Sequence, residues 1–200
     1  MHIRANAIVC ASRPHAETAA IVRLLTADHG LIAGYVAGAR GRVLRPVVIP
    51  GNRVDVELRA RSDSRLPTAR LELLQSRGPW LGEPLQSAAI VWVTALTAAA
   101  LPEWQAHPPL YQGLAALLDA ICLAPSARGW APPLLSYEAL LLRELGYGGG
   151  DRRPDGEDWP ALLHAFDRMG RDLARYPLAH QRTDVMGARA MLRERLARIG

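Results

Sequence analysis

The chain has 200 residues, of which 50% are hydrophobic and 22% are charged, a composition typical of a folded globular protein with one large domain or two small ones. It contains no lysine, so all 24 basic side chains are arginine. This excludes a conventional P-loop NTPase and Schiff-base catalysis, because both depend on a lysine amine.

The formal net charge of +5 is concentrated in the first part of the chain. Residues 1–77 hold twelve arginines and six acidic residues, a net charge of +6, whereas the remainder carries −1. A basic segment of this kind is typical of a surface that binds a polyanion.

The first 77 residues contain five short runs with β-strand character, separated by turns rich in glycine and proline. In the clearest run, Val54, Val56 and Leu58 alternate with charged residues. Five strands without a long helix predict a small closed barrel of the OB type. The runs cover residues 3–12, 18–26, 31–37, 52–61 and 68–74.

From residue 82 onward the apolar residues follow a helical period, and the first three helix-length segments each have proline near their first turn. The predicted helices cover residues 84–101, 108–123, 132–145, 160–176 and 184–199. The chain is therefore predicted to be of the α+β class, with a nucleic-acid-binding barrel at residues 1–79 and a partner-binding helical domain at residues 80–200.

In the last helix we expect an apolar stripe opposite an arginine face. The stripe is Met186, Ala190, Leu192, Leu196 and Ile199, and the face is Arg189, Arg193, Arg195 and Arg198.

No motif points to catalysis or to a metal. Cys10 and Cys122 lie far apart in apolar surroundings, so we expect them in the core. The six histidines form no HExxH pair, and no GxSxG sequence is present. We expect no cofactor, no metal site and no enzyme activity. A pocket in which two or more titratable groups converge would favour the alternative, an enzyme with a dispersed site.

One uncharged stretch, residues 85–101, needs comparison with a membrane span. It is rich in alanine and threonine and is shorter than the roughly 20 strongly apolar residues that a span requires. We expect it to be a buried helix. The N-terminal apolar run is too short for a signal peptide, so the predicted location is the cytoplasm.

Arginines gather on one predicted loop and on the strand that follows it. The loop GARGRVLR, residues 38–45, contributes Arg40, Arg42 and Arg45, and we expect it to be mobile. Guanidinium groups bind phosphate oxygens in bidentate fashion, so this loop beside an OB barrel predicts a nucleic-acid site. The strand contributes Arg53, Arg59 and Arg61. In the alternative interpretation these arginines are solvated or paired with Asp55 and Glu57. Only one aromatic residue, Tyr35, lies in the barrel, so we expect contacts with the phosphate backbone to dominate.

Three strings, in order and at matching spacing, resemble the bacterial RecO family of recombination mediators. They are HAETAAIVRLLTADHGLIAGYVAGARG (15–41), RPVVIPGN (45–52) and YEALLLRELGY (137–147). The resemblance implies an N-terminal OB fold and a helical C-terminal domain. It also implies binding to single- and double-stranded DNA, annealing without nucleotide hydrolysis, and association with the nucleoid. The implied partners are RecR and the acidic tail of the single-stranded DNA-binding protein, SSB, with RecA loaded indirectly.

The chain departs from the family pattern near residues 146–159. Many members carry a cysteine zinc module there, whereas this sequence reads GYGGGDRRPDGEDW and has no cysteine. We therefore do not expect zinc.

For the SSB tail, the helical part offers Arg143, Arg168, Arg171 and Arg175. A different binding class, an OB-fold protein that binds RNA, fits the same basic face. Competition between DNA and RNA of equal sequence would separate the two, because proteins can recognise the 2′-hydroxyl.

Overall fold

The computed structural model describes residues 1–60, 66–148, 158–181 and 184–199. It forms two compact units. The first comprises Met1–Gly82 together with Leu101–Tyr111, and the second comprises Glu83–Ala100 together with Gln112–Gly200. The boundary expected at residues 79 and 80 stays a prediction.

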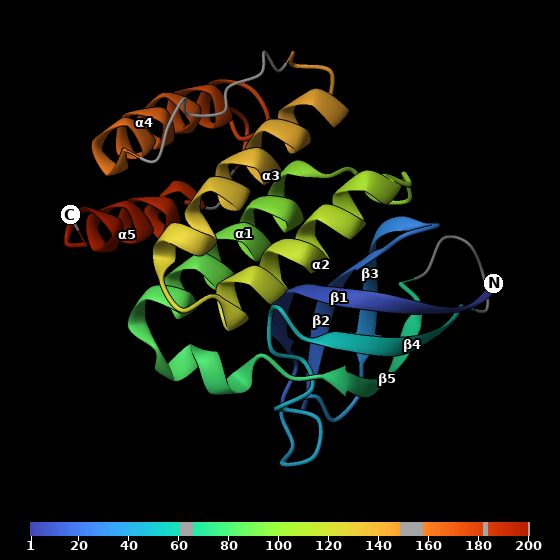
Figure 1. Ribbon diagram of the computed structural model, residues 1–200. Helices are drawn as coiled ribbons and strands as arrows, with labels where there is room; N and C mark the ends of the chain where they lie inside the picture. The colour runs from blue at the N-terminus through green and yellow to red at the C-terminus, as the bar shows by residue number, and fades with distance from the viewer. Residues whose placement is uncertain (61–65, 149–157, 182–183, 200) are drawn as a thin grey trace. The chain divides into compact units, whose positions relative to one another are not determined.

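The first unit is a closed β-barrel with the neighbour order β1-β2-β3-β5-β4 (Figure 1). Its strands are β1 (His2–His15), β2 (Ala19–Thr26), β3 (Gly30–Val36), β4 (Arg53–Arg59) and β5 (Thr68–Gln75), followed by the short 3-10 helix η1 (Gly78–Gly82). The predicted five-stranded OB-type barrel followed by helices is confirmed. The alternation of β4 explains its inner face, because Val54, Val56 and Leu58 are fully buried in the barrel core.

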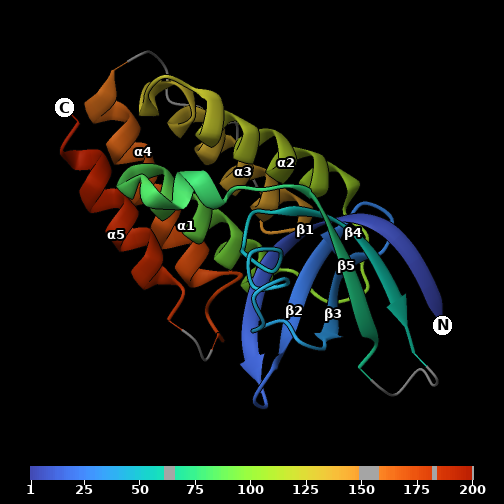
Figure 2. The ribbon, with the colours of Figure 1, turned by 90° about the horizontal axis from the view of Figure 1, so that it is seen from below.

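Two local features let five short strands close. The register of β1 shifts between Val9 and Ala11, so that its first half pairs with β4 and its second half with β2. β3 and β5 meet in parallel at Tyr35 and Thr68. A Cβ atom on Gly34 would lie 2.9 Å from the Cβ of Ala69, so glycine is needed for this close approach. The strands wrap around one another in both views (Figure 1, Figure 2).

A segment distant in sequence completes the first unit. Glu103 forms a parallel bridge with Leu31 at the start of β3, and the backbone N–H of Trp104 donates to the Leu31 carbonyl at 3.0 Å. The guanidinium of Arg23 on β2 lies 3.1 Å from the Glu103 carboxylate. Residues that follow the first long helix therefore return to the barrel.

The helices of the chain match the predicted segments closely. They are α1 (Pro84–Ala100), α2 (Pro108–Leu123), η2 (Ala127–Gly129), α3 (Ala131–Glu144), α4 (Trp159–Arg175) and α5 (Met186–Ala197). Nine of the seventeen residues of α1 are buried, as expected for its uncharged sequence. α4 and α5 run side by side in both views (Figure 1, Figure 2). Within the described residues, no helix is both long enough and apolar enough to span a membrane.

The predicted arginine face of α5 is wrong at Arg189. This side chain is buried, its Nη2 lies 2.9 Å from a fully buried oxygen of Glu138 on α3, and its guanidinium lies 3.6 Å from the Phe166 ring centre. The buried residues of α5 are Arg189, Leu192 and Leu196, whereas Ala190 and Ile199 are exposed. Arg189 can be buried because its guanidinium pairs with the Glu138 carboxylate and makes cation–π contacts with the Trp92 and Phe166 rings.

Candidate nucleic-acid interface

The arginine loop, residues 38–45, lies in the connection between β3 and β4 and is anchored by its apolar residues. Ala39, Val47 and Val48 are buried in the barrel core, and Leu44 packs against it. Backbone hydrogen bonds from Arg45 to Gly41 and from Val48 to Leu44 close helix-like turns at 2.9 and 3.1 Å. The expected mobile loop is therefore a folded segment, because Ala39, Leu44, Val47 and Val48 make apolar contacts with the core that the arginine pattern concealed.

Asn52 holds the far end of this connection, and sequence reasoning did not single it out. It is fully buried, and its Nδ2 donates to the carbonyls of Pro46 at 2.8 Å and Val47 at 3.1 Å. Its Oδ1 accepts the backbone N–H of Arg77 at 2.7 Å. One side chain thus satisfies three backbone groups that the sheet does not pair, as buried polar groups require. The only sequence signal was an asparagine after a Pro-Gly turn.

The three arginines of the loop are all exposed. The backbone N–H of Arg40 donates to the Thr18 carbonyl at 3.0 Å, and its Nη1 donates to the Glu17 carbonyl at 2.9 Å. This side chain is therefore oriented by the turn between β1 and β2. Within the part of the chain that the structure describes, Arg42 and Arg45 have no side-chain hydrogen bond or ion pair. The loop thus presents three positive charges, none of which binds a carboxylate of the described residues.

The arginines predicted on the strand behave differently. Arg59 donates from Nε to the Oε1 of Glu57 at 2.8 Å, so for this residue the paired alternative holds. Arg53 is half-buried, and its Nε is buried without a hydrogen-bond partner among the described residues. Arg61 lies outside the described residues. The structure places Arg40, Arg42 and Arg45 on one folded segment, and Arg53 and Arg59 at opposite ends of β4.

The outward face of β1, β4 and β5 carries alternating charges. Arg4 on β1 binds Asp55 through two nitrogens at 2.9 and 2.7 Å, and this hydrogen bond raises the pKa of Arg4. Hydrogen bonds from Arg59 and then His2 lower the pKa of Glu57. Because acids and bases neutralise one another here, this face is a weaker attraction for phosphate than the arginine loop.

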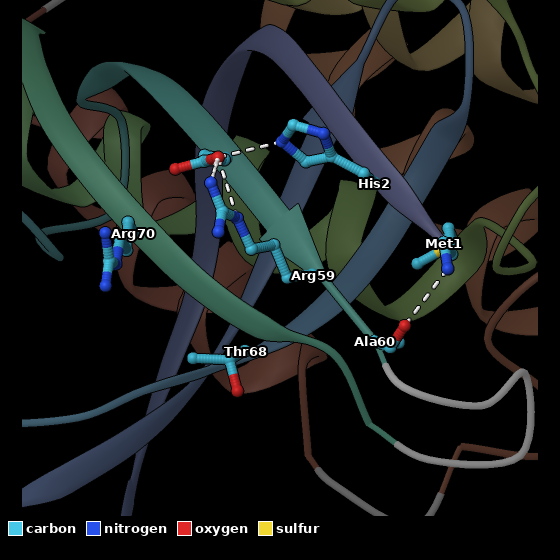
Figure 3. A pocket seen from close by; sticks show the side chains of 7 residues that line it. Met1, His2, Arg59, Ala60, Thr68 and Arg70 are labelled. Atoms are coloured by element: carbon cyan, nitrogen blue, oxygen red, sulfur yellow. Dashed lines mark hydrogen bonds and ion pairs between the residues drawn. The ribbon is translucent and has the colours of Figure 1, made fainter.

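A pocket of about 630 Å³ opens beside the start of β1 and the end of β4 (Figure 3). His2 and Arg59 converge on the Glu57 carboxylate, and Thr68 and Arg70 line the β5 side (Figure 3). Two titratable groups therefore meet in a pocket, as the enzyme alternative requires. However, two donors keep the Glu57 carboxylate ionised, which makes it a weak base, so we interpret the Arg59–Glu57 ion pair as a feature that shapes this surface.

The second unit carries four exposed arginines of the predicted set, and one of them, Arg175, lies beside two stacked aromatic rings. Tyr147 and Tyr176 stack with ring centres 5.4 Å apart, and the Arg175 guanidinium lies 5.5 Å from the Tyr176 ring centre. Arg143, Arg168, Arg171 and Arg175 are all exposed. Among the described residues, no three His, Cys, Asp or Glu side chains group as metal ligands, and most of the stretch 146–159 lies outside them.

The chain matches two models of one family. The model described as Recombination protein O N terminal matches residues 1–77, and the one described as Recombination protein O C terminal matches residues 82–148. Curated relatives named DNA repair protein RecO are 43% identical over 144 residues in Rhodospirillum centenum and 40% identical over 145 residues in Caulobacter vibrioides strain NA1000. Each match covers 72% of this chain, but only 56% and 58% of those proteins.

Proposed function

The chain belongs to the RecO family of DNA repair proteins, and we propose that it is a recombination mediator that acts by binding DNA. In this proposal it binds single- and double-stranded DNA, anneals complementary strands and, with RecR, helps to load RecA on SSB-coated DNA. No nucleotide is hydrolysed, in keeping with the absence of lysine for a P-loop.

The observation that carries the proposal is the arginine loop. Its three exposed arginines stand on a segment that Ala39 and Leu44 anchor to the barrel core. A positively charged edge on an anchored backbone suits phosphate oxygens, because the planar guanidinium fork can engage phosphate through two hydrogen bonds. The carbonyl of Glu17 already orients Arg40. Arg42 and Arg45 give up no ion pair among the described residues when a phosphate arrives.

The same geometry supports annealing. Two complementary strands repel each other through their phosphates, and a surface that neutralises a few phosphates on one strand lowers this repulsion. Contacts with phosphate carry no sequence information, so any complementary pair can be served. The proposed mechanism is electrostatic capture of the backbone, which leaves the base edges free to pair.

The test reverses the charge of Arg40, Arg42 and Arg45 to Glu. If the three side chains neutralise about three phosphates, the plot of log affinity against log salt for a single strand should lose roughly 2 units of slope, at ~0.7 per phosphate. The anchoring side chains stay unchanged, so the circular-dichroism spectrum should match that of the parent. The matched control reverses Arg168, Arg171 and Arg175 on α4, which are also exposed and change the net charge by the same amount.

The proposal requires the loop variant to lose much more DNA affinity than the α4 variant. Equal losses would mean that the overall charge of the chain drives binding. A loss in the α4 variant alone would move the site to the second unit. Annealing of bare complementary strands, without SSB or nucleotide, should follow the same order.

For the SSB tail we propose the surface around Tyr147, Tyr176 and Arg175. An acidic tail with hydrophobic end residues needs exposed apolar rings beside positive charge, and this surface offers both. A fluorescent tail peptide should bind the full chain, and reversal of Arg168, Arg171 and Arg175 should weaken it. The loop variant should bind the peptide normally. If the loop variant loses the peptide instead, this assignment is wrong.

A further inference from the structure

A row of outward-facing side chains crosses the barrel and links the two groups of predicted arginines. Direct opposition in the sheet places Arg13 against Ile21, Ile21 against Tyr35, Tyr35 against Thr68, and Thr68 against Arg59. Residues that oppose each other directly lie on the same face of a sheet. We call these five residues the outward row. It has an arginine at each end and an aromatic ring in its middle.

Tyr35 is held in a defined position within this row. Its neighbours Gly34 and Val36 are buried on the inner face, whereas Tyr35 itself is half-buried on the outer face. Its backbone N–H donates to the Pro67 carbonyl at 2.8 Å, where β3 and β5 meet. The ring of His15 packs edge-on against the Tyr35 ring, with centres 5.9 Å apart and an interplanar angle of 88°. The ring is therefore held by one flanking side chain and is only half-buried, so it loses little freedom when a flat partner packs on its exposed part.

The outward row continues into the arginine loop through the turn between β1 and β2. His15 contacts Tyr35, and the next residue, Ala16, has a φ of 53°, a conformation that residues with side chains adopt at a cost. The carbonyls of Ala16 and Glu17 face Arg40, whose Nη1 donates to the latter at 2.9 Å. Arginines therefore occur along this path at Arg13, Arg40 and Arg59, of which Arg59 is bound to Glu57.

We propose that Tyr35 stacks on an unpaired base, and that the outward row and the arginine loop together form a track for a single strand. This inference rests on the proposed function and adds a preference for single strands to it. An aromatic ring between cations fits a chain in which a flat base accompanies each phosphate. A duplex keeps its bases paired and stacked inside, so it can use the arginines but not the ring.

The experiment compares the full chain with the variants Tyr35→Leu and Tyr35→Phe. The probes are a single strand, a duplex of the same sequence and an abasic strand of equal length, all at one salt concentration. Tyr35→Leu should weaken single-strand binding roughly 5- to 150-fold, the range for one base–aromatic stack. It should leave duplex binding within about twofold. Tyr35→Phe keeps the ring and should bind like the parent. Tyr111→Leu, a half-buried tyrosine on α2, is the matched control and should change neither affinity.

The abasic strand separates stacking from a structural effect. It offers phosphates but no bases, so the parent and Tyr35→Leu should bind it equally. If Tyr35→Leu weakens all three probes alike, or none of them, the stacking role is refuted. If the loop reversal still weakens binding in that case, the proposed function stands and only this inference falls. If the parent binds no DNA, the proposed function itself fails.

Discussion

Replacing Arg189 with Leu tests whether the buried ion pair organises the second unit. In the parent, Arg189 donates to the two carboxylate oxygens of Glu138 at 3.1 and 2.9 Å and to the Phe166 carbonyl at 2.8 Å. The substitution removes all three hydrogen bonds. Among the described residues, Glu138 then keeps the indole N–H of Trp92, at 2.7 Å, as its one remaining side-chain donor.

The expected cost follows from the burial of the partners. The side chain of Glu138 is 0% exposed and that of Arg189 is 5% exposed. Removing one member of a buried pair leaves an uncompensated charge and costs about 3–5 kcal/mol of unfolding free energy. For a chain of this length each kcal/mol lowers Tm by about 2–4 °C, so the melting of the helices should shift by roughly 6–20 °C.

Helical ellipticity followed against temperature measures this shift. The matched control is Arg193→Leu in the same helix, whose partner Asp167 is 41% exposed and 2.8 Å away. Because solvent screens that pair, its loss should cost about 0–1 kcal/mol. The double variant Arg189→Leu, Glu138→Gln should recover part of the stability, because a neutral amide leaves no buried charge and can still accept from Trp92. A loss at Arg189 no larger than the loss at Arg193 would refute this account.

Three further predictions concern single positions. Gly170→Ala should destabilise the second unit in chemical denaturation, because the new Cβ would lie 2.3 Å from the Nη1 of Arg189, which its hydrogen bonds hold in place. Alanine favours helices by ~1 kcal/mol relative to glycine, so a stabilised variant would contradict this account. Gly30→Ala should lower the unfolding free energy of the barrel in urea by roughly 1–3 kcal/mol or more, since Gly30 has a φ of +68° and its Cβ would meet the Gln105 carbonyl oxygen at 1.9 Å; an unchanged midpoint would rule this out. Burial raises the pKa of the Cys10 thiol from 9.0 to about 12, so this thiol should react with a disulfide reagent only after unfolding. Its contribution to the free energy of unfolding should be lost as the pH rises from about 9 to about 12, and Cys10→Ala should reduce that loss.

The sequence alone determined the elements and the fold class, because both depend on short-range periodicity. The two-residue alternation of Val54, Val56 and Leu58 defines β4, and these residues are buried as predicted. The proline-led apolar segments became α1 and α2 with nearly the expected bounds. The exposure of Arg40, Arg42 and Arg45 also followed from composition, because arginines on a loop seldom become buried without a partner.

Tertiary structure decided which charged side chains form ion pairs within the protein and which stay unpaired at its surface. Arg59 and Glu57 stand two residues apart on one strand face, and the sequence left both pairing and solvation open. Glu138 and Arg189 are separated by 51 residues, so no local pattern could predict their pairing or the burial of an arginine on α5. The row from Arg13 through Tyr35 to Arg59 exists only because barrel closure sets four strand registers at once. Strand pairing is a non-local property of the chain, and the face of each side chain depends on register to the single residue.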